Sequence, residues 1–185
     1  MEDQLIEGTS YLEQEVIQET YDYCTFSKCD FTKAHLSGCI FNDCIFSGCN
    51  LSMTDFNQST LNNVSFKNCK ILGVNFSKCH DFIFEVGFED SVLDYTSFEK
   101  RKMGKTTFLR SSLKGVDFAM ADLKQCTFVH CDLNEAIFYN TNLQEVDFTS
   151  AYNYIIDPDQ NNIKKARFSR EGLAGLLDKF NIIIE

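Results

Sequence analysis

Cysteine and histidine are the residues of this chain whose side chains most readily support metal or thiol chemistry. The 185-residue sequence holds 9 Cys and 3 His. Cys29, Cys49 and Cys69 recur at a regular spacing, which would suit a column of thiolate ligands. Thiolate metal sites are usually completed by further Cys, His or carboxylate ligands, whereas these positions alternate with Phe and Leu. We therefore interpret the cysteines as small buried residues and expect no metal and no cofactor.

The histidines and aspartates do not form a catalytic arrangement either. His35, His80 and His130 lie far apart along the chain, and the aspartates beside large apolar residues occur singly rather than as paired carboxylates. The sequence has no phosphate-binding loop, dinucleotide fingerprint or nucleophile elbow. We expect a protein that is not an enzyme and takes no small-molecule substrate.

The composition narrows the classes of partner. The formal net charge is −10 and the pI is about 4.7, a balance that argues against direct binding to nucleic acid or to an anionic membrane. No apolar run approaches the length of a transmembrane helix, and the acidic start lacks the features of a signal peptide. We expect a cytoplasmic protein whose odd number of cysteines stays reduced.

A repeat of five residues determines where these side chains lie. Large apolar residues occupy every fifth position from Phe26 to Phe76 and again from Phe88 to Phe148. The residue two positions before each is small, with Arg101 as the one exception, and the residue between them is usually polar. Inward, outward, inward is the alternation of a short strand. The two polar residues that follow would turn a corner before the alternation restarts.

A second period, of 20 residues, indicates four sides to each coil. Phe88, Phe108, Phe128 and Phe148 share this spacing, and the leucines that begin at Leu93 repeat in the same way. Coils stacked at about 4.8 Å would build a rod of roughly 31 Å from residues 21–151. The sequence predicts an all-β fold, a four-sided parallel β-helix.

These residues resemble the pentapeptide-repeat family, whose members form right-handed four-sided β-helices. Stretches such as CTFSKCDFTKAHL at 24–36 and CNLSMTDF at 49–56 repeat the family pattern. The helical C-terminal end is most similar to the quinolone-resistance Qnr proteins and their mycobacterial relatives, which bind DNA gyrase or topoisomerase IV. Some of these have been interpreted as mimics of duplex DNA. The resemblance therefore implies a right-handed fold and a type II topoisomerase as partner.

The repeat is interrupted between Phe76 and Phe88. Two extra residues fall in this interval, and we interpret them as a bulge or a bend of the rod near 77–87. Qnr proteins carry longer loops that project from the rod and that their protective activity needs. This sequence has no insertion of that length.

A second interruption is the basic stretch that contains Lys100, Arg101, Lys102 and Lys105. Arg101 falls on an inward position, and an unpaired buried guanidinium is not tolerated. We therefore expect the strand to bulge and Arg101 to reach solvent. The stretch is then either a solvated charge run or, together with Arg110, a basic contact patch.

The two ends of the rod differ from its middle. Residues 1–20 hold 6 acidic and no basic residues and are expected to form a degenerate first coil with an acidic cap, so that the repeat region spans 21–168. Ser169 is suited to begin a short α-helix and Asn181 to end it. Residues 169–185 would then cap the rod, with a terminal strand at 182–184.

The C-terminal segment also carries more apolar surface than one rod end needs, which is typical of an interface. We expect a homodimer through this segment, and the alternative is a monomer whose helix only caps its own coil. The residues assigned to the dimer interface are Leu173, Leu176, Leu177, Phe180, Ile182, Ile183 and Ile184.

Two classes of function remain. The first is a non-enzymatic rod that binds a type II topoisomerase as a partial DNA mimic and modulates quinolone susceptibility; the second is a general interaction scaffold with an unrelated protein partner. Residues 21–150 carry 16 acidic and 12 basic residues, whereas ~31 Å of duplex carries roughly 18 charges, so any competition with DNA should be weak. The residues assigned to partner contact are Arg101, Lys102, Lys105, Asp117, Asp122, Asp132 and Asp147.

Overall fold

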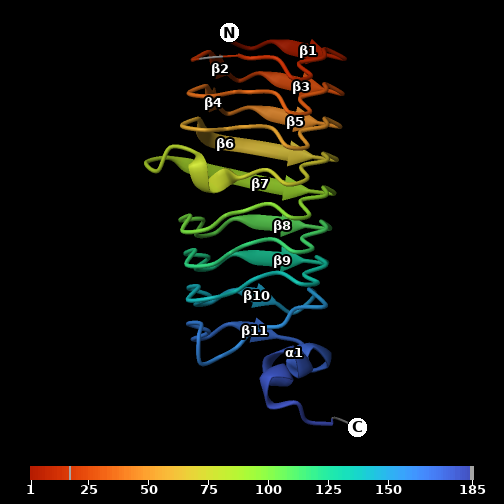
Figure 1. The fold of residues 1–185 in the computed structure, drawn as a ribbon, viewed down its shortest axis with the longest axis vertical. Helices are drawn as coiled ribbons and strands as arrows, with labels where there is room; N and C mark the ends of the chain where they lie inside the picture. The colour runs from red at the N-terminus through yellow and green to blue at the C-terminus, as the bar shows by residue number, and fades with distance from the viewer. Residues whose placement is uncertain (17, 184–185) are drawn as a thin grey trace.

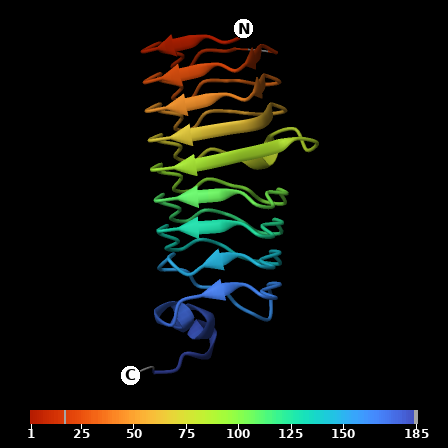
Figure 2. The same ribbon diagram turned by 180° about the vertical axis from the view of Figure 1, so that it is seen from behind.

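The computed structural model describes residues 1–16 and 18–183 and shows a parallel β-helix (Figure 1). On one face the strands stack in the order β1, β3, β5, β6, β7, β8, β9, β10 and β11. The view from behind places the short helical segment at the C-terminal end of the stack (Figure 2). The strands of this face span Leu5–Glu7 (β1), Thr25–Ser27 (β3), Ile45–Ser47 (β5), Thr60–Lys67 (β6), Phe84–Glu89 (β7), Thr107–Leu109 (β8), Thr127–Val129 (β9), Asp147–Phe148 (β10) and Arg167–Phe168 (β11). Strands β2, Thr20–Asp22, and β4, Ile40–Asn42, lie on the adjacent face.

The phenylalanine columns form the core, as the period of 20 predicts. Phe26 pairs with Phe46 along the parallel ladder, and their rings stack with centroids 4.7 Å apart. A second column meets the first edge-on, for example Phe118 against Phe128 at 5.9 Å. Parallel and edge-to-face aromatic contacts both stabilise beyond their burial alone. The interior of the rod is therefore packed with side chains and is not a channel.

Each corner is a tight β-turn built mostly without glycine. At one corner the Ala34 N–H donates to the Phe31 carbonyl oxygen at 2.9 Å, and Lys33 has φ of 53°. Non-glycine residues in this left-handed region are strained by roughly 1–2 kcal/mol each. The hydrogen bonds between coils and the buried columns must offset that strain at nearly every corner.

Small inward positions that hold Cys, Ser or Thr also make a hydrogen bond, which the sequence pattern did not reveal. Cys49 Sγ donates to the Phe26 carbonyl oxygen at 3.3 Å, Thr54 Oγ1 to the Phe31 oxygen at 2.8 Å, and Ser59 Oγ to the Leu36 oxygen at 2.6 Å. Each carbonyl belongs to the preceding coil. Cys, Ser and Thr thus share one role here, that of a small side chain that donates to the preceding coil.

Residues 1–20, apart from residue 17, form a coil in the same register as the rest. Strand β1 pairs with β3, and isolated bridges join Ser10 to Asp30 and Glu15 to His35. The positions of this coil that correspond to the small inward ones elsewhere, Thr9, Gln14 and Glu19, are exposed. Gln14 Nε2 instead bonds the Ser10 carbonyl at 3.1 Å and so covers part of the open edge.

The two extra residues fall between a 3₁₀ helix at Phe76–Lys78 (η1) and strand β7. The pairing interval widens from 20 residues, Phe46 with Phe66, to 22, Phe66 with Phe88, and then returns to 20. The extra chain projects from the rod beside β7 (Figure 1). The two residues are therefore accommodated in a bulge, and the later coils keep the same faces as the earlier ones.

The C-terminal segment is helical but is mostly 3₁₀ in character. It consists of η2 (Glu171–Leu173), α1 (Ala174–Leu177) and η3 (Asp178–Phe180). Ser169 Oγ accepts the Gly172 N–H at 3.1 Å, and Asn181 ends the segment at φ 48° and ψ 43°, as the sequence predicted for both residues. Residues 182–183 form no strand, which corrects that prediction, and Ile184 lies outside the described residues. No helix in the described chain is long and apolar enough to cross a bilayer.

Candidate interaction surface

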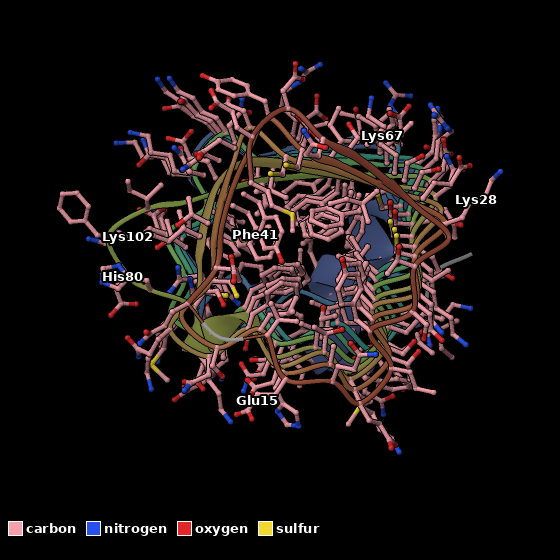
Figure 3. The ribbon with its side chains drawn as sticks, turned by 90° about the horizontal axis from the view of Figure 1, so that it is seen from above. Glu15, Lys28, Phe41, Lys67, His80 and Lys102 are labelled. Atoms are coloured by element: carbon pink, nitrogen blue, oxygen red, sulfur yellow. The ribbon has the colours of Figure 1, made fainter. Side chains whose placement is uncertain are left out.

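The loop that contains the two extra residues is the main departure from a smooth rod surface. Its Phe82 side chain is 87% exposed. Looking down the rod, His80 and Lys102 lie on the side where the chain bulges outward (Figure 3). Phe82 lines a hollow of about 510 Å³ with Lys102 and Lys105. The surface therefore combines an exposed aromatic ring with two basic side chains and with the acidic side chains of Asp81 and Glu85.

Arg101 lies beneath this loop, and the expectation that it reaches solvent is wrong. Its side chain is 3% exposed. Nη1 donates to the Cys79 carbonyl at 3.0 Å and to Asp81 Oδ1 at 2.9 Å, and Nη2 donates to the His80 carbonyl at 2.9 Å. The guanidinium also lies over the Phe84 ring, 4.3 Å from its centroid. The bulge supplies the acceptors that make the buried charge tolerable, so Arg101 supports the loop and is not itself exposed for contact.

The four aspartates assigned to partner contact lie on four different faces. Bridges place Asp117 beside Ser97, Asp122 beside Lys102 and Asp132 beside Ser112, while Asp147 pairs in β10. Each also accepts the backbone N–H two residues further on, at 2.9, 3.2, 3.2 and 2.9 Å in that order. Aspartate commonly makes this local bond in turns. The fold does not bring these carboxylates together, and all four have a structural role at a corner.

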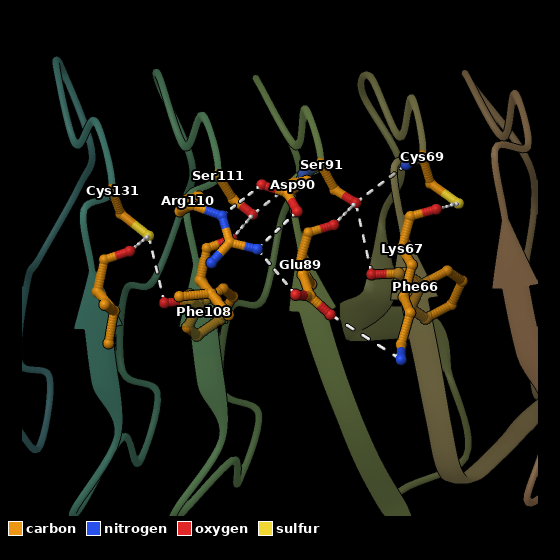
Figure 4. A network of polar contacts seen from close by, with 12 residues as sticks. Phe66, Lys67, Cys69, Glu89, Asp90, Ser91, Phe108, Arg110, Ser111 and Cys131 are labelled. Atoms are coloured by element: carbon orange, nitrogen blue, oxygen red, sulfur yellow. Dashed lines mark hydrogen bonds and ion pairs between the residues drawn. The ribbon is translucent and has the colours of Figure 1, made fainter.

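Arg110 belongs to a separate polar network at another corner (Figure 4). Its Nε donates to Asp90 Oδ1 at 2.7 Å, and Nη2 donates to Glu89 Oε1 at 2.8 Å. The hydrogen bond from Arg110 holds the pKa of Asp90 below its ordinary value. Strand β8 separates Arg110 from Lys105. The structure therefore does not join Arg110 to the basic residues near Phe82.

The apolar residues of the C-terminal segment are divided between the rod and solvent. Leu176 packs against the core. Leu173, Leu177 and Phe180 are 46%, 37% and 60% exposed. Ile182 and Ile183 are likewise exposed. Most of the apolar surface assigned to a dimer interface is therefore accessible.

The cysteines lie inside the rod and do not gather into a metal site. All 9 are free and buried. Burial raises the pKa of Cys126 to about 12 and that of Cys131 to about 11, so these thiols stay protonated at neutral pH. Within the described residues there is no group of three or more His, Cys, Asp or Glu that could hold a metal ion.

Comparison with known families matches the repeat directly. A model described as a pentapeptide repeat region matches residues 20–98, and one described as pentapeptide repeats (8 copies) matches residues 121–152. The chain belongs to the pentapeptide-repeat family. No curated protein sequence matches this pentapeptide-repeat chain significantly.

Solved structures of the same fold cover the whole rod. A trypsin-treated variant of QnrB1, described as a plasmid-mediated fluoroquinolone resistance protein, matches with a TM-score of 0.69 at 18% identity, covering 98% of this chain and 100% of that one. A second trypsin-treated variant of QnrB1 matches with a TM-score of 0.66 at 18% identity, covering 99% and 96%. These matches confirm the parallel pentapeptide-repeat β-helix that the sequence predicted.

Proposed function

We propose that this protein is a non-enzymatic interaction rod whose partner is a type II DNA topoisomerase. The observation that carries the proposal is the end-to-end match of the chain to QnrB1, including its C-terminal segment. The Qnr proteins that the sequence resembles bind gyrase or topoisomerase IV. A rigid rod with a packed interior offers its outer faces for such contacts.

The charge distribution makes the proposed DNA mimicry partial. Acidic side chains occur on all four faces, and several are already neutralised by bases of the adjacent coil, as Glu13 is by Lys33 at 3.1 Å and Glu89 by Arg110 at 2.8 Å. Duplex DNA has a far denser and unpaired charge. We therefore expect at most weak competition with DNA, with Lys102 and Lys105 contributing contacts that DNA cannot make.

A supercoiling assay tests the topoisomerase proposal. Purified gyrase is assayed with the protein at up to micromolar concentration, with and without a quinolone. Low salt is used because electrostatic mimicry should be strongest there. Inhibition of supercoiling, or rescue of supercoiling from the drug, supports the proposal. If neither occurs at low salt, the topoisomerase proposal fails.

We also propose that the protein is a cytoplasmic homodimer joined through its C-terminal segment. Exposed apolar surface on Leu173, Leu177, Phe180, Ile182 and Ile183 supports this arrangement. A two-fold contact between two such segments would cover all of it at once.

The second candidate function is a general scaffold with an unrelated protein partner. It is favoured by the corner carboxylates, because Asp117 and Asp132 are already engaged with backbone N–H groups and lie on different faces. An affinity pull-down from the source cells, scored for gyrase subunits, separates the two candidates.

A further inference from the structure

Phe82 is exposed although nothing in the packing of the rod requires an aromatic residue there. Its side chain is 87% exposed, the highest value of any phenylalanine in the described chain. The neighbouring Phe84 fills the inward position and is buried. The Phe82 ring is not part of the hydrophobic core of the described residues.

The loop beneath Phe82 is held in place by several bonds. Arg101 binds the carbonyls of Cys79 and His80 and the carboxylate of Asp81 at 2.9–3.0 Å. The Phe82 N–H donates to His80 Nδ1 at 3.3 Å. A side chain presented from an anchored loop loses less conformational freedom on binding. These bonds hold in place the loop that presents Phe82.

The charges beside the ring indicate the chemistry of that partner. Lys102 and Lys105 line the same hollow as Phe82, together with the carboxylates of Asp81 and Glu85. Neither lysine has an ion pair with any acidic side chain in the part of the chain that the structure describes, whereas Asp81 is already paired with Arg101. The hollow therefore keeps two lysines against one carboxylate, that of Glu85, and an occupant with carboxylates at the rim would match this excess of positive charge. Two lysines and one ring are too few for strong attachment to a membrane surface.

We propose that Phe82, Lys102 and Lys105 form a docking surface for a protein partner that has an apolar socket rimmed by carboxylates. Phe82 enters the socket as the central anchor, and the lysines pair with the rim. Aromatic anchors surrounded by weaker polar contacts are the usual arrangement at tight interfaces. The proposal rests on the proposed interaction function, but it does not require the partner to be a topoisomerase.

The first test of the docking surface measures binding of the purified full-length protein to immobilised gyrase holoenzyme, at low and at high salt. Phe82→Ser and the pair Lys102→Glu with Lys105→Glu are each expected to weaken binding at least roughly tenfold. The charge-reversal pair should also remove most of the salt dependence. Matched controls change the same kinds of group elsewhere: Tyr152→Ser, and Lys164→Glu with Lys165→Glu. The controls should stay within about twofold of the unmodified protein, and all variants should keep its melting temperature.

The outcomes separate the two proposals. If gyrase binds the unmodified protein and Phe82→Ser equally well, the docking surface is wrong and the topoisomerase proposal stands. If gyrase does not bind at all, the topoisomerase proposal fails, and a photo-crosslinking experiment decides the docking surface. In that experiment benzoylphenylalanine replaces Phe82, or Tyr152 as control, in a lysate of the source cells.

A protein captured from position 82 but not from position 152 is then purified and titrated with the same variants. A tenfold loss with Phe82→Ser and with the charge-reversal pair supports the docking surface. Equal affinity of the variants overturns it, as does the absence of any protein captured above the control. Labelling of nucleic acid or of phosphatidylglycerol vesicles in place of a protein would also overturn it.

Discussion

Replacing Arg101 by Met is expected to destabilise the protein by about 1–3 kcal/mol. Methionine keeps an unbranched apolar side chain but removes the guanidinium. The variant loses hydrogen bonds to the Cys79 and His80 carbonyls, made at 3.0 and 2.9 Å, and bonds from a charged donor contribute about 1.5–3 kcal/mol each. It also loses the contact over the Phe84 ring, worth about 0.5–2 kcal/mol. Removing the guanidinium also removes the free-energy cost of burying its charge away from water, and this offsets several kcal/mol of the loss.

Urea unfolding measures the net effect, and chymotrypsin measures the local one. Chymotrypsin cleaves after exposed aromatic residues, so cleavage after Phe82 should become faster when Arg101 no longer holds the loop. Asp81→Asn is the first control and should cost under about 1 kcal/mol, because the Asp81 side chain is 98% exposed. Lys100→Met is the second control, since Lys100 is an exposed neighbour paired with Glu99 at 2.7 Å.

Two results would refute this reasoning. If Arg101→Met is as stable as the unmodified protein and cleavage at Phe82 is unchanged, apolar packing holds the loop and the buried bonds contribute nothing net. If Asp81→Asn destabilises more than Arg101→Met does, the surface ion pair is the dominant interaction.

Four further predictions concern the core, the thiols and the C-terminal end. Phe118→Ala should lower the free energy of unfolding by about 3–5 kcal/mol, because the ring is fully buried between Phe98 and Phe138; a loss under roughly 1 kcal/mol in urea unfolding would contradict that placement. Thiol titration should find few of the 9 cysteines reactive before denaturation and all of them after, because all are buried; nine reactive thiols in the native protein would be incompatible with the fold. Burial raises the pKa of Cys44 and Cys131 to about 11 and that of Cys79 and Cys126 to about 12, so the stability from keeping these thiols protonated is complete below about pH 8.5. It should be lost as the pH rises toward 11–12, by up to about 1.4 kcal/mol per pH unit for each thiol, and urea midpoints that do not fall between pH 8 and 10.5 would contradict this. Light scattering should give about twice the 21.2 kDa chain mass, and Phe180→Ser with Ile183→Ser should return the protein to monomers; a monomer mass across a wide concentration range would remove the dimer.

The period of the sequence was sufficient to predict the core. Phe108 and Leu123, for example, are fully buried. A repeat of 20 residues brings each such position back to the same inward place in every coil. Spacing alone also locates the interval that contains the bulge. It does not tell which of Phe82 and Phe84 turns inward, because both lie off the regular register. The exposed ring therefore became visible only in the structure.

The prediction for Arg101 failed for a physical reason. The rule that a buried guanidinium needs partners was sound, but the carbonyls that serve it come from Cys79 and His80 in the preceding coil. Local spacing around Arg101 contains no sign of them. The partner role assigned to Asp117 and Asp132 stays a prediction. Spacing alone does not separate it from a structural role, because turns with a backbone N–H bond to aspartate use the same residue type as a charged surface does.

The strand predicted for the terminal isoleucines failed because local propensity was given too much weight. A run of Ile favours a strand by propensity, yet a strand needs a neighbour, and Ile182 and Ile183 have none among the described residues. Tertiary pairing decides the conformation of such a short segment.

The 22-residue coil returns the chain to the face from which it started, since Phe66 lies against Phe88 and Phe88 against Phe108. The two extra residues of this coil therefore loop out without changing the direction in which later side chains point. Removing one 20-residue coil would shorten the rod by about 4.8 Å and leave every later side chain pointing the same way. Removing a single five-residue side would instead rotate everything beyond it by a quarter turn. Adding or removing whole coils would therefore change the distance between the Phe82 loop and the C-terminal end in fixed steps, while the relative orientation of the two would be preserved.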